Sequence, residues 1–434
     1  MSPAVISLLI LALCIVLFIT RPIPNAATAC LGCLLFVLTG VCDVKDAFSG
    51  FSNTTVLLMF GMMVVGIAMM DTGVAAIIGD FVAKVSAHNE KLFILMAGTA
   101  SALLSTFLSN TAVIAIFLPI IASVAASDKR MNRMNLTLPV TMGAMFGGTC
   151  TLVGSTPQLT ANGILKEMAD GLELKMFDYT LPGVIIFAVY MLYILFIGPH
   201  FAKRIWGNRV PEADDTPAEE TQKPGINKLK LILMLVIFAA TVGFFIFGEK
   251  IERDGKAVFT TEVVAVCAAL LCIICRCTSV KQVIKHMDWS VVFVLAGCLG
   301  IAKGITASGA GDLMGKGVSK VLHDGIPALV VFAVFVLATM VVSNFITNST
   351  AVTIMLPIAL SLCAVNGLNP IAFTLGIVFA ANLTFSTPLA NAQTAMTLVA
   401  GYKFSDYIRY TWLLDLLVFG AILAAVPLCF PLTV

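Results

Sequence analysis

The sequence predicts an all-α polytopic membrane protein built from two inverted-topology repeats. Of its 434 residues, 59% are hydrophobic and only 12% are charged, with a mean hydropathy of +1.01. A soluble domain carries roughly 25% charged residues, so this composition excludes an ordinary soluble protein. Apolar segments close to the ~20 residues that a helix needs to cross a bilayer recur from end to end. The two halves of the chain also share polar residues in register.

The apolar segments predict ten spans and two interrupted stretches. We expect spans near residues 4–20, 26–42, 54–70, 138–168 (with a break), 180–200, 229–248, 259–276, 290–303, 371–400 (with a break) and 410–430. The stretches near 92–126 and 327–364 each contain a polar cluster midway, so each forms either a pair of spans or a hairpin that enters and leaves on one side. Because the first residues show no basic stretch and no small-residue cleavage site, we expect a first span rather than a removed signal.

An internal duplication relates the two halves. Val44-Lys45, Val56, Gly61 and Thr72-Gly73 match Val280-Lys281, Val292, Gly297 and Ser308-Gly309 at an offset of 236, and residues 105–111 and 118–120 match 343–349 and 356–358 at an offset of 238. Chance apolar similarity does not keep Ser, Phe, Asn and Pro in register. We therefore expect a first repeat at 1–205 with its hairpin near 92–126, a cytoplasmic linker at 206–228, and a second repeat at 229–434 with its hairpin near 327–364.

Charge counting supports inversion. If both hairpins are re-entrant, each half has five spans, one of them broken, and an odd number inverts the second half. An outside N-terminus then places 17 of the 26 basic residues inside, as the positive-inside rule expects. This predicts a multi-pass protein of the plasma (inner) membrane with residues 203–230 in the cytoplasm.

Four polar clusters interrupt the apolar stretches. The hairpins contain Ser109-Asn110-Thr111 and Thr347-Asn348-Ser349, and the broken spans contain Gly148-Thr149 through Pro157 and Asn382 through Pro388. A single cluster is most simply a helix cap or a turn. Corresponding clusters in two inverted halves instead favour a binding site, because broken helices at membrane depth must face protein or a polar cavity. We expect all four to converge near the midplane.

The clusters contain no Asp, Glu, Lys, Arg or His, which leaves no acid or base for hydrolysis. Half-helix N-termini with hydroxyl and amide donors suit an anion. Carbonyls freed by proline and glycine, together with Ser, Thr and Asn oxygens, suit a hard monovalent cation such as Na⁺. Bound Na⁺ would offset the charge of the anion, which is otherwise costly at the midplane.

The paired hairpin motifs, the Gly154-Ser155-Thr156-Pro157 and Ser386-Thr387-Pro388 breaks and the inverted repeat resemble the divalent anion/sodium symporter family of the ion transporter superfamily. The resemblance implies transport of dicarboxylates, citrate or sulfate by homodimers whose transport domains move as elevators, with Na⁺ as coupling ion, no other cofactor and no catalytic residue. It implies Na⁺ ligands at Ser105, Ser109, Asn110 and Gly154, and at Ser343, Thr347, Asn348 and Ser386. It implies a substrate site at Asn110, Thr111, Ser155, Thr156, Asn348, Ser349, Thr387 and Pro388.

Three departures from the family pattern leave the substrate open. The usual Pro-Pro-Asn after the first break is Thr156-Pro157-Gln158 here, and the second break reads Pro388-Leu389-Ala390-Asn391. Thr347 and Ser349 also reverse the usual hydroxyls of the second hairpin. We expect a secondary transporter of a small divalent anion, a C4-dicarboxylate ahead of citrate or sulfate. The alternatives are Na⁺-independent exchange or carriage of another anion. A more remote one is an intramembrane hydrolase, suggested by Gly309-Ala310-Gly311-Asp312, but the partner Tyr-Asp dipeptide is missing.

Two further features have structural interpretations. Asp415, in the last span, could relay protons as an intramembrane acid, but Tyr410 and Trp412 nearby favour a satisfied structural carboxylate at the interface. Gly143 and Gly147 form a GxxxG pattern in the first broken span, which we expect to pack closely against the hairpin. No feature of the sequence predicts a nucleic-acid partner, since the net charge is only +2.

Overall fold

The computed structural model describes residues 2–85, 89–128, 131–206, 227–253, 256–321, 326–388 and 391–433. The predicted linker at 206–228 therefore lies almost entirely outside the described residues. Within them the chain is nearly all helical, as predicted, and the single sheet is a short antiparallel pair, β1 (Glu252–Arg253) with β2 (Lys256–Ala257).

The helices follow one another in two comparable series. The first half contains α1 (Pro3–Thr20), α2 (Asn25–Leu38), α3 (Val44–Ala47), α4 (Thr54–Asp71), α5 (Val74–Val85), α6 (Glu90–Ser105), α7 (Asn110–Ser127), α8 (Arg133–Gly148), α9 (Thr156–Met168), α10 (Thr180–Leu192) and α11 (Gly198–Trp206), with the 3-10 turn η1 (Ser49–Ser52) and the π-helical turn η2 (Tyr193–Ile197). The second half contains α12 (Lys228–Phe247), α13 (Thr261–Ile274), α14 (Val280–His286), α15 (Trp289–Ala307), α16 (Ala310–Val321), α17 (Ala328–Ser343), α18 (Asn348–Asn366), α19 (Pro370–Asn382), α20 (Ala392–Met396) and α21 (Phe404–Cys429), with the 3-10 turns η3 (Gly248–Lys250) and η4 (Thr397–Ala400).

The helices confirm a multi-pass membrane protein. Across the described ranges, eight helical stretches are long and apolar enough to cross a bilayer. Six coincide with predicted spans, and the other two, α7 and α18, are the second arms of the predicted hairpins. The prediction carried the second span to residue 42, which is wrong: α2 ends at Leu38 because Gly40 adopts a left-handed backbone with φ of +72°. At 14 residues, α2 rises only ~21 Å, less than the ~30 Å bilayer core.

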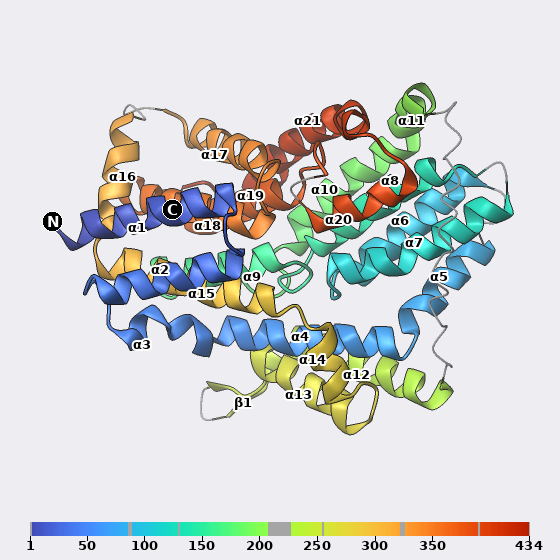
Figure 1. Cartoon of the computed structure of the whole chain (residues 1–434), viewed down its shortest axis with the longest axis horizontal. Coiled ribbons are helices and arrows are strands. Elements are labelled where there is room, and N and C mark those ends of the chain that lie inside the picture. The colour runs from blue at the N-terminus through green and yellow to red at the C-terminus, as the bar shows by residue number, and fades with distance from the viewer. Residues whose placement is uncertain are drawn as a thin grey trace.

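Reciprocal packing joins the two halves. α4 packs on α13, and α15 packs on α2; Figure 1 shows α13 below α4 and α15 beside α2. A Cβ added at Gly61 would lie 2.7 Å from the Ala265 carbonyl oxygen, and one at Gly297 would lie 2.6 Å from Cβ of Ala29. Both residues of the first pair lie 236 positions from their counterparts in the second. Residues that correspond in the sequence therefore make the same helix contact twice.

Small residues also set the packing around the hairpins. A Cβ at Gly143 would lie 2.6 Å from the Gly98 carbonyl oxygen, and one at Gly147 would lie 2.1 Å from the Ala102 carbonyl oxygen. Gly98 and Ala102 belong to α6, so the GxxxG pattern packs against the hairpin, as predicted. Because α8 meets α6 backbone to backbone, the end of α8 is held at a fixed distance from the hairpin tip.

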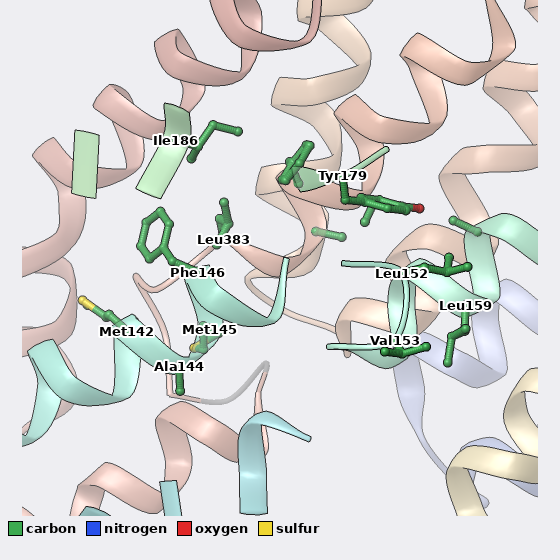
Figure 2. Packing of buried hydrophobic residues seen from close by; sticks show 14 of the residues in the cluster. Met142, Ala144, Met145, Phe146, Leu152, Val153, Leu159, Tyr179, Ile186 and Leu383 are labelled. Carbon is green, nitrogen blue, oxygen red and sulfur yellow. The ribbon is translucent and has the colours of Figure 1, made fainter. Parts of the chain in front are cut away.

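The core surrounds the two broken helices. Only 22% of the apolar window of α12 is buried, whereas 72% of that of α18 is buried, so α12 faces outward and α18 is central. Phe146, near the end of α8, stacks on Phe385 beyond the end of α19 with ring centroids 5.4 Å apart. Figure 2 shows Phe146 with Leu383 from these two helix ends, and Leu152 and Val153 from the first break. This apolar packing fixes the breaks where polar groups must meet.

Candidate functional site

A hydrogen bond between its two arms holds the tip of the first hairpin. The hydroxyl of Ser105, the last residue of α6, donates to Oδ1 of Asn110 at 2.5 Å, and both residues are buried. Asn110 begins α7, and a Cβ added at Gly148 would lie 2.1 Å from its Oδ1. A Cβ at Gly154 would lie 2.9 Å from the Ser105 carbonyl oxygen. The tip therefore lies directly against the break between α8 and α9.

The second hairpin repeats this arrangement. Ser343, the last residue of α17, has its hydroxyl 3.1 Å from Oδ1 of Asn348, which begins α18. The same hydroxyl lies 2.7 Å from the carbonyl oxygen of Ala381, near the end of α19. Ser343 is fully buried, as Ser105 is. Each hairpin tip thus combines a serine, an asparagine and the end of a broken helix.

Asn382 connects the two breaks to the second tip. It is the last residue of α19 and is 2% exposed. Its Oδ1 accepts hydrogen bonds from the Ser155 hydroxyl at 2.9 Å and from Nδ2 of Asn348 at 3.4 Å. Its Nδ2 donates to Oε1 of Gln158 at 3.2 Å. The first tip joins the same network because Gln158 also donates to the Gly148 carbonyl at 2.7 Å. Hydrogen bonds and close contacts therefore link all four polar clusters, and their position at the midplane stays a prediction.

An amide side chain satisfies a freed carbonyl in each break. Nε2 of Gln158 lies 3.2 Å from the Thr151 carbonyl oxygen, seven residues earlier, and Nδ2 of Asn391 lies 3.4 Å from the Thr384 carbonyl oxygen, also seven residues earlier. Gln158 ends the first departure from the family's Pro-Pro-Asn pattern, and Asn391 ends the Pro388-Leu389-Ala390-Asn391 reading of the second break. Each break therefore has an amide that returns to its own unwound backbone.

The predicted Na⁺ ligands are only partly brought together. In the first set, hydrogen bonds and close backbone contacts bring together Ser105, Asn110 and Gly154. In the second set they bring together Ser343 and Asn348. Ser109 is exposed and caps α7, accepting from the Ala112 amide at 3.3 Å. The Thr347 hydroxyl lies 2.7 Å from that of Thr350. The Ser386 hydroxyl faces α21 and not the second hairpin tip, so its place in the predicted set stays a prediction.

The remaining predicted substrate residues line the same region. The Thr111 hydroxyl accepts from Gln393 of α20 at 3.3 Å, which brings α20 to the first tip. The Thr387 hydroxyl donates to the Asn344 carbonyl in the second tip. The other three lie in the structure as follows: Thr156 begins α9 and is half-buried, Ser349 lies in the first turn of α18, and Pro388 is buried after the second break.

The sequence did not predict that a charged residue lies beside the second break. The Ser386 hydroxyl donates to Oδ2 of Asp415 at 2.5 Å, so a carboxylate from α21 reaches the second break. Asp415 was expected to be satisfied, but its Oδ1 is buried without a hydrogen-bond partner. The four polar clusters contain no charged residue, as their sequences show, but the second break has the Asp415 carboxylate beside it.

The geometry suits ion and anion binding more than bond chemistry. Serine hydroxyls, asparagine oxygens and unwound carbonyls meet at both tips, and such oxygen sets coordinate hard cations in broken-helix transporters. The N-termini of α7, α9 and α18 present amides for an anion. Within the described chain, no group of three His, Cys, Asp or Glu residues is arranged to hold a metal ion. Asp312 of the hydrolase-like pattern is exposed on α16.

Comparisons with known proteins agree with transport. The chain is 33% identical over 188 residues to the uncharacterized transporter YfbS of Escherichia coli (strain K12), which covers 43% of this chain but only 30% of that protein. It is 22% identical over 408 residues to the sodium-dependent dicarboxylate transporter SdcS of Staphylococcus saprophyticus, covering 88% and 78% of the two chains. Among solved structures, MtrF of Neisseria gonorrhoeae superposes with a TM-score of 0.68 at 14% identity, over 100% of this chain and 95% of that one.

A family match also covers most of the chain. Residues 15–346, more than half of the chain, match the family described as citrate transporter. This family and the relatives above are transporters, so the hydrolase alternative is wrong and the chain is not an enzyme. Together with the recurring spans and the paired polar breaks, this match shows that the chain belongs to the citrate transporter family, among the divalent anion and sodium transporters.

Proposed function

We propose that this protein is a Na⁺-coupled secondary active transporter of small divalent anions, with a C4-dicarboxylate as its preferred substrate and citrate or sulfate as alternatives. The observation that carries the proposal is the buried network in which two Ser–Asn hairpin tips meet two broken helices at Asn382. The relative SdcS, which is named a sodium-dependent dicarboxylate transporter, supports the same function.

The anion would be held by helix ends and neutral donors. Each helix N-terminus acts as about half a positive charge, and α7, α9 and α18 all begin at the network. Asn110 and Asn348, the first residues of two of these helices, each carry an amide that can donate to a carboxylate. Two such donors on opposite hairpin tips suit a substrate with an acidic group at each end.

Na⁺ would occupy the oxygen groups behind each tip. At the first tip the candidate ligands are the Ser105 hydroxyl, the Asn110 amide oxygen and the nearby Gly148 and Gly154 backbone. At the second they are Ser343, Thr347 and Asn348, with Ser386 from the break. Because each asparagine belongs to both the ion and the substrate sets, bound Na⁺ would orient the amide for the anion, and this couples the two ligands.

The twofold packing supports alternating access. Gly61 on Ala265 and Gly297 on Ala29 form the same contact from opposite halves, which supports an internal repeat. We propose that these helices form the scaffold of a homodimer, against which the hairpins and broken helices move as an elevator. In this arrangement the protein lies in the plasma membrane with its N-terminus outside and residues 203–230 in the cytoplasm.

Uptake into liposomes tests the function. Purified protein should take up labelled succinate, malate, citrate or sulfate faster with an inward Na⁺ gradient than with an equal K⁺ gradient. Uptake that needs unlabelled anion inside the liposomes and ignores Na⁺ would instead establish Na⁺-independent exchange. An absence of uptake for every anion under both conditions would contradict transport of this substrate class.

The asparagines test the site. Asn110→Ala and Asn348→Ala should each abolish Na⁺-driven uptake, because each side chain is assigned to both the ion and the anion. Asn53→Ala is the matched control: Asn53 caps α4 away from the network, and losing its cap should cost only about 1 kcal/mol of stability. Wild-type uptake by both site variants would remove the hairpin tips from the mechanism.

A further inference from the structure

A buried carboxylate adjoins the second break without a cationic partner. Asp415 lies on α21, one helical turn after Thr411, so both side chains point from the same face. Oδ2 of Asp415 accepts from the Ser386 hydroxyl at 2.5 Å, and that hydroxyl lies 3.2 Å from Oγ1 of Thr411. Oδ1 of Asp415 is buried and has no hydrogen-bond partner. The hydroxyls of Ser386 and Thr411, from two elements, thus adjoin a carboxylate that has one unsatisfied oxygen.

The neighbouring elements supply no described counter-charge. α21 packs against α10, α11, α17 and α19. α10, α17 and α19 contain no charged residue, and the titratable group that faces Asp415 from η2 is Tyr193, whose hydroxyl donates to the Tyr410 carbonyl. α11 carries His200, Lys203 and Arg204, none of which forms a described ion pair with Asp415. A lone buried carboxylate is costly unless it is neutralised, and a bound cation is one way to stabilise it.

We propose that Asp415, Ser386 and Thr411 form a Na⁺ site in which the Asp415 carboxylate is the charged ligand. This rests on the proposed function and extends it by adding α21 to the ion site of the second half. A carboxylate with two hydroxyls is the hard oxygen set that a small alkali cation prefers. The Ser386 hydroxyl uses its proton on Asp415 and keeps its lone pairs for a cation. A proton would bind one oxygen of Asp415 and would not use the lone pairs of the Ser386 and Thr411 hydroxyls.

The proposed site has a mechanical consequence. Ser386 belongs to the break after α19, and Thr387 beside it donates to Asn344 in the second hairpin tip. Na⁺ between Ser386 and α21 would therefore fix the break against that tip, where Asn348 is assigned to the substrate. The ion would order the anion site without touching the anion.

Asp415→Asn tests the site because asparagine keeps the shape and removes the charge. Two quantities are measured: Na⁺-dependent thermal stabilisation of purified protein without substrate, and the Na⁺ dependence of anion uptake. In the variant we expect the half-saturating Na⁺ concentration to rise about tenfold or more in both, and the Hill coefficient of uptake to fall by about one. Asp312→Asn, an exposed carboxylate on α16, is the control and should behave as wild type.

The outcomes separate this proposal from the proposed function. An unchanged Na⁺ response in Asp415→Asn overturns the site, and so does a variant that loses pH dependence while its Na⁺ dependence stays intact, because that result identifies a proton site. A third outcome is possible: wild-type protein shows no Na⁺-driven uptake, but Na⁺ stabilises wild type and does not stabilise Asp415→Asn. In that case the transport coupling fails and the site stands. Ser386→Ala, which retains the carboxylate, should weaken Na⁺ about threefold to tenfold and provides the test if Asp415→Asn does not fold.

Discussion

Replacing Gln158 with leucine should destabilise the protein and disable the site together. Gln158 is fully buried, and its amide donates to the Gly148 carbonyl at 2.7 Å and lies 3.2 Å from the Thr151 carbonyl. Its oxygen accepts from Asn382 at 3.2 Å. Leucine has a similar volume but no polar atom, so Gln158→Leu removes all three interactions and leaves their partners buried.

The expected cost follows from those three interactions. A hydrogen bond contributes about 0.5–1.5 kcal/mol net, and a buried group left unsatisfied costs about 1–3 kcal/mol. The gain from burying a leucine, roughly 1.5–3 kcal/mol, offsets part of this loss. We expect the free energy of unfolding to fall by about 3 kcal/mol. Uptake should fall further, because the freed Gly148 carbonyl and Asn382 amide adjoin both predicted ion sites.

A second glutamine provides the matched control. Gln393 makes one longer hydrogen bond, 3.3 Å to Thr111, at the exposed side of the site, so Gln393→Leu should change the unfolding free energy by about 0.5 kcal/mol at most. Denaturant titration of both variants in detergent, followed by tryptophan fluorescence, measures the difference. Equal midpoints for Gln158→Leu and Gln393→Leu would refute the assignment of Gln158 as the residue that satisfies the first break.

Two further perturbations probe packing and charge. Gly147→Ala would place a Cβ 2.1 Å from the Ala102 carbonyl oxygen, so it should lower the free energy of unfolding by about 1–3 kcal/mol and abolish uptake. Gly420→Ala is the control: a Cβ added there would meet no neighbour within 4 Å, so the change should be neutral or slightly stabilising. Equal thermal midpoints for the two variants would contradict the α6–α8 contact. The second perturbation concerns Glu90, which precedes the predicted hairpin stretch at 92–126. Its carboxylate accepts a hydrogen bond from Asn135 at 2.9 Å, and burial raises its pKa. The folded state then resists ionisation of Glu90, so stability falls as pH rises through the raised pKa. Glu90→Gln should remove that fall in thermal midpoints measured from pH 4 to 8, and an unchanged pH profile would show that Glu90 does not cause it.

The breaks and hairpins were predictable because their signals are local. Glycine, proline and short polar residues inside apolar stretches end helices wherever they occur, and α8, α19 and both hairpin tips end at the predicted residues. The GxxxG contact was predictable for the same reason, since its spacing lies within one helix. The C-terminal end of α2 was harder to predict, because the left-handed turn at Gly40 stops the helix within a segment that is still apolar.

The partners across the site were not predictable because they are remote in sequence. Asn382 bonds Ser155 and Gln158 from 227 and 224 positions away, and no periodicity in a single chain specifies such pairs. Gln158 is a departure from the family motif in the sequence, although the structure gives it the same kind of interaction that Asn391 makes in the second break. Asp415 was judged by its neighbours in sequence, whereas its surroundings are set by how α21 passes the second break.

These contacts make the two halves electrically unequal, which bears on the transport cycle. The first tip is neutral, whereas the second break adjoins Asp415. If one Na⁺ binds at each, a divalent anion and two Na⁺ cancel, and the loaded and empty carriers both retain only the charge of Asp415. The two legs of the cycle would then move the same charge in opposite directions, so one complete cycle moves no net charge. The steady-state accumulation of dicarboxylate should therefore be unchanged when a K⁺ diffusion potential is imposed, and a steep voltage dependence of that accumulation would show that the ion sites do not balance the substrate in this way.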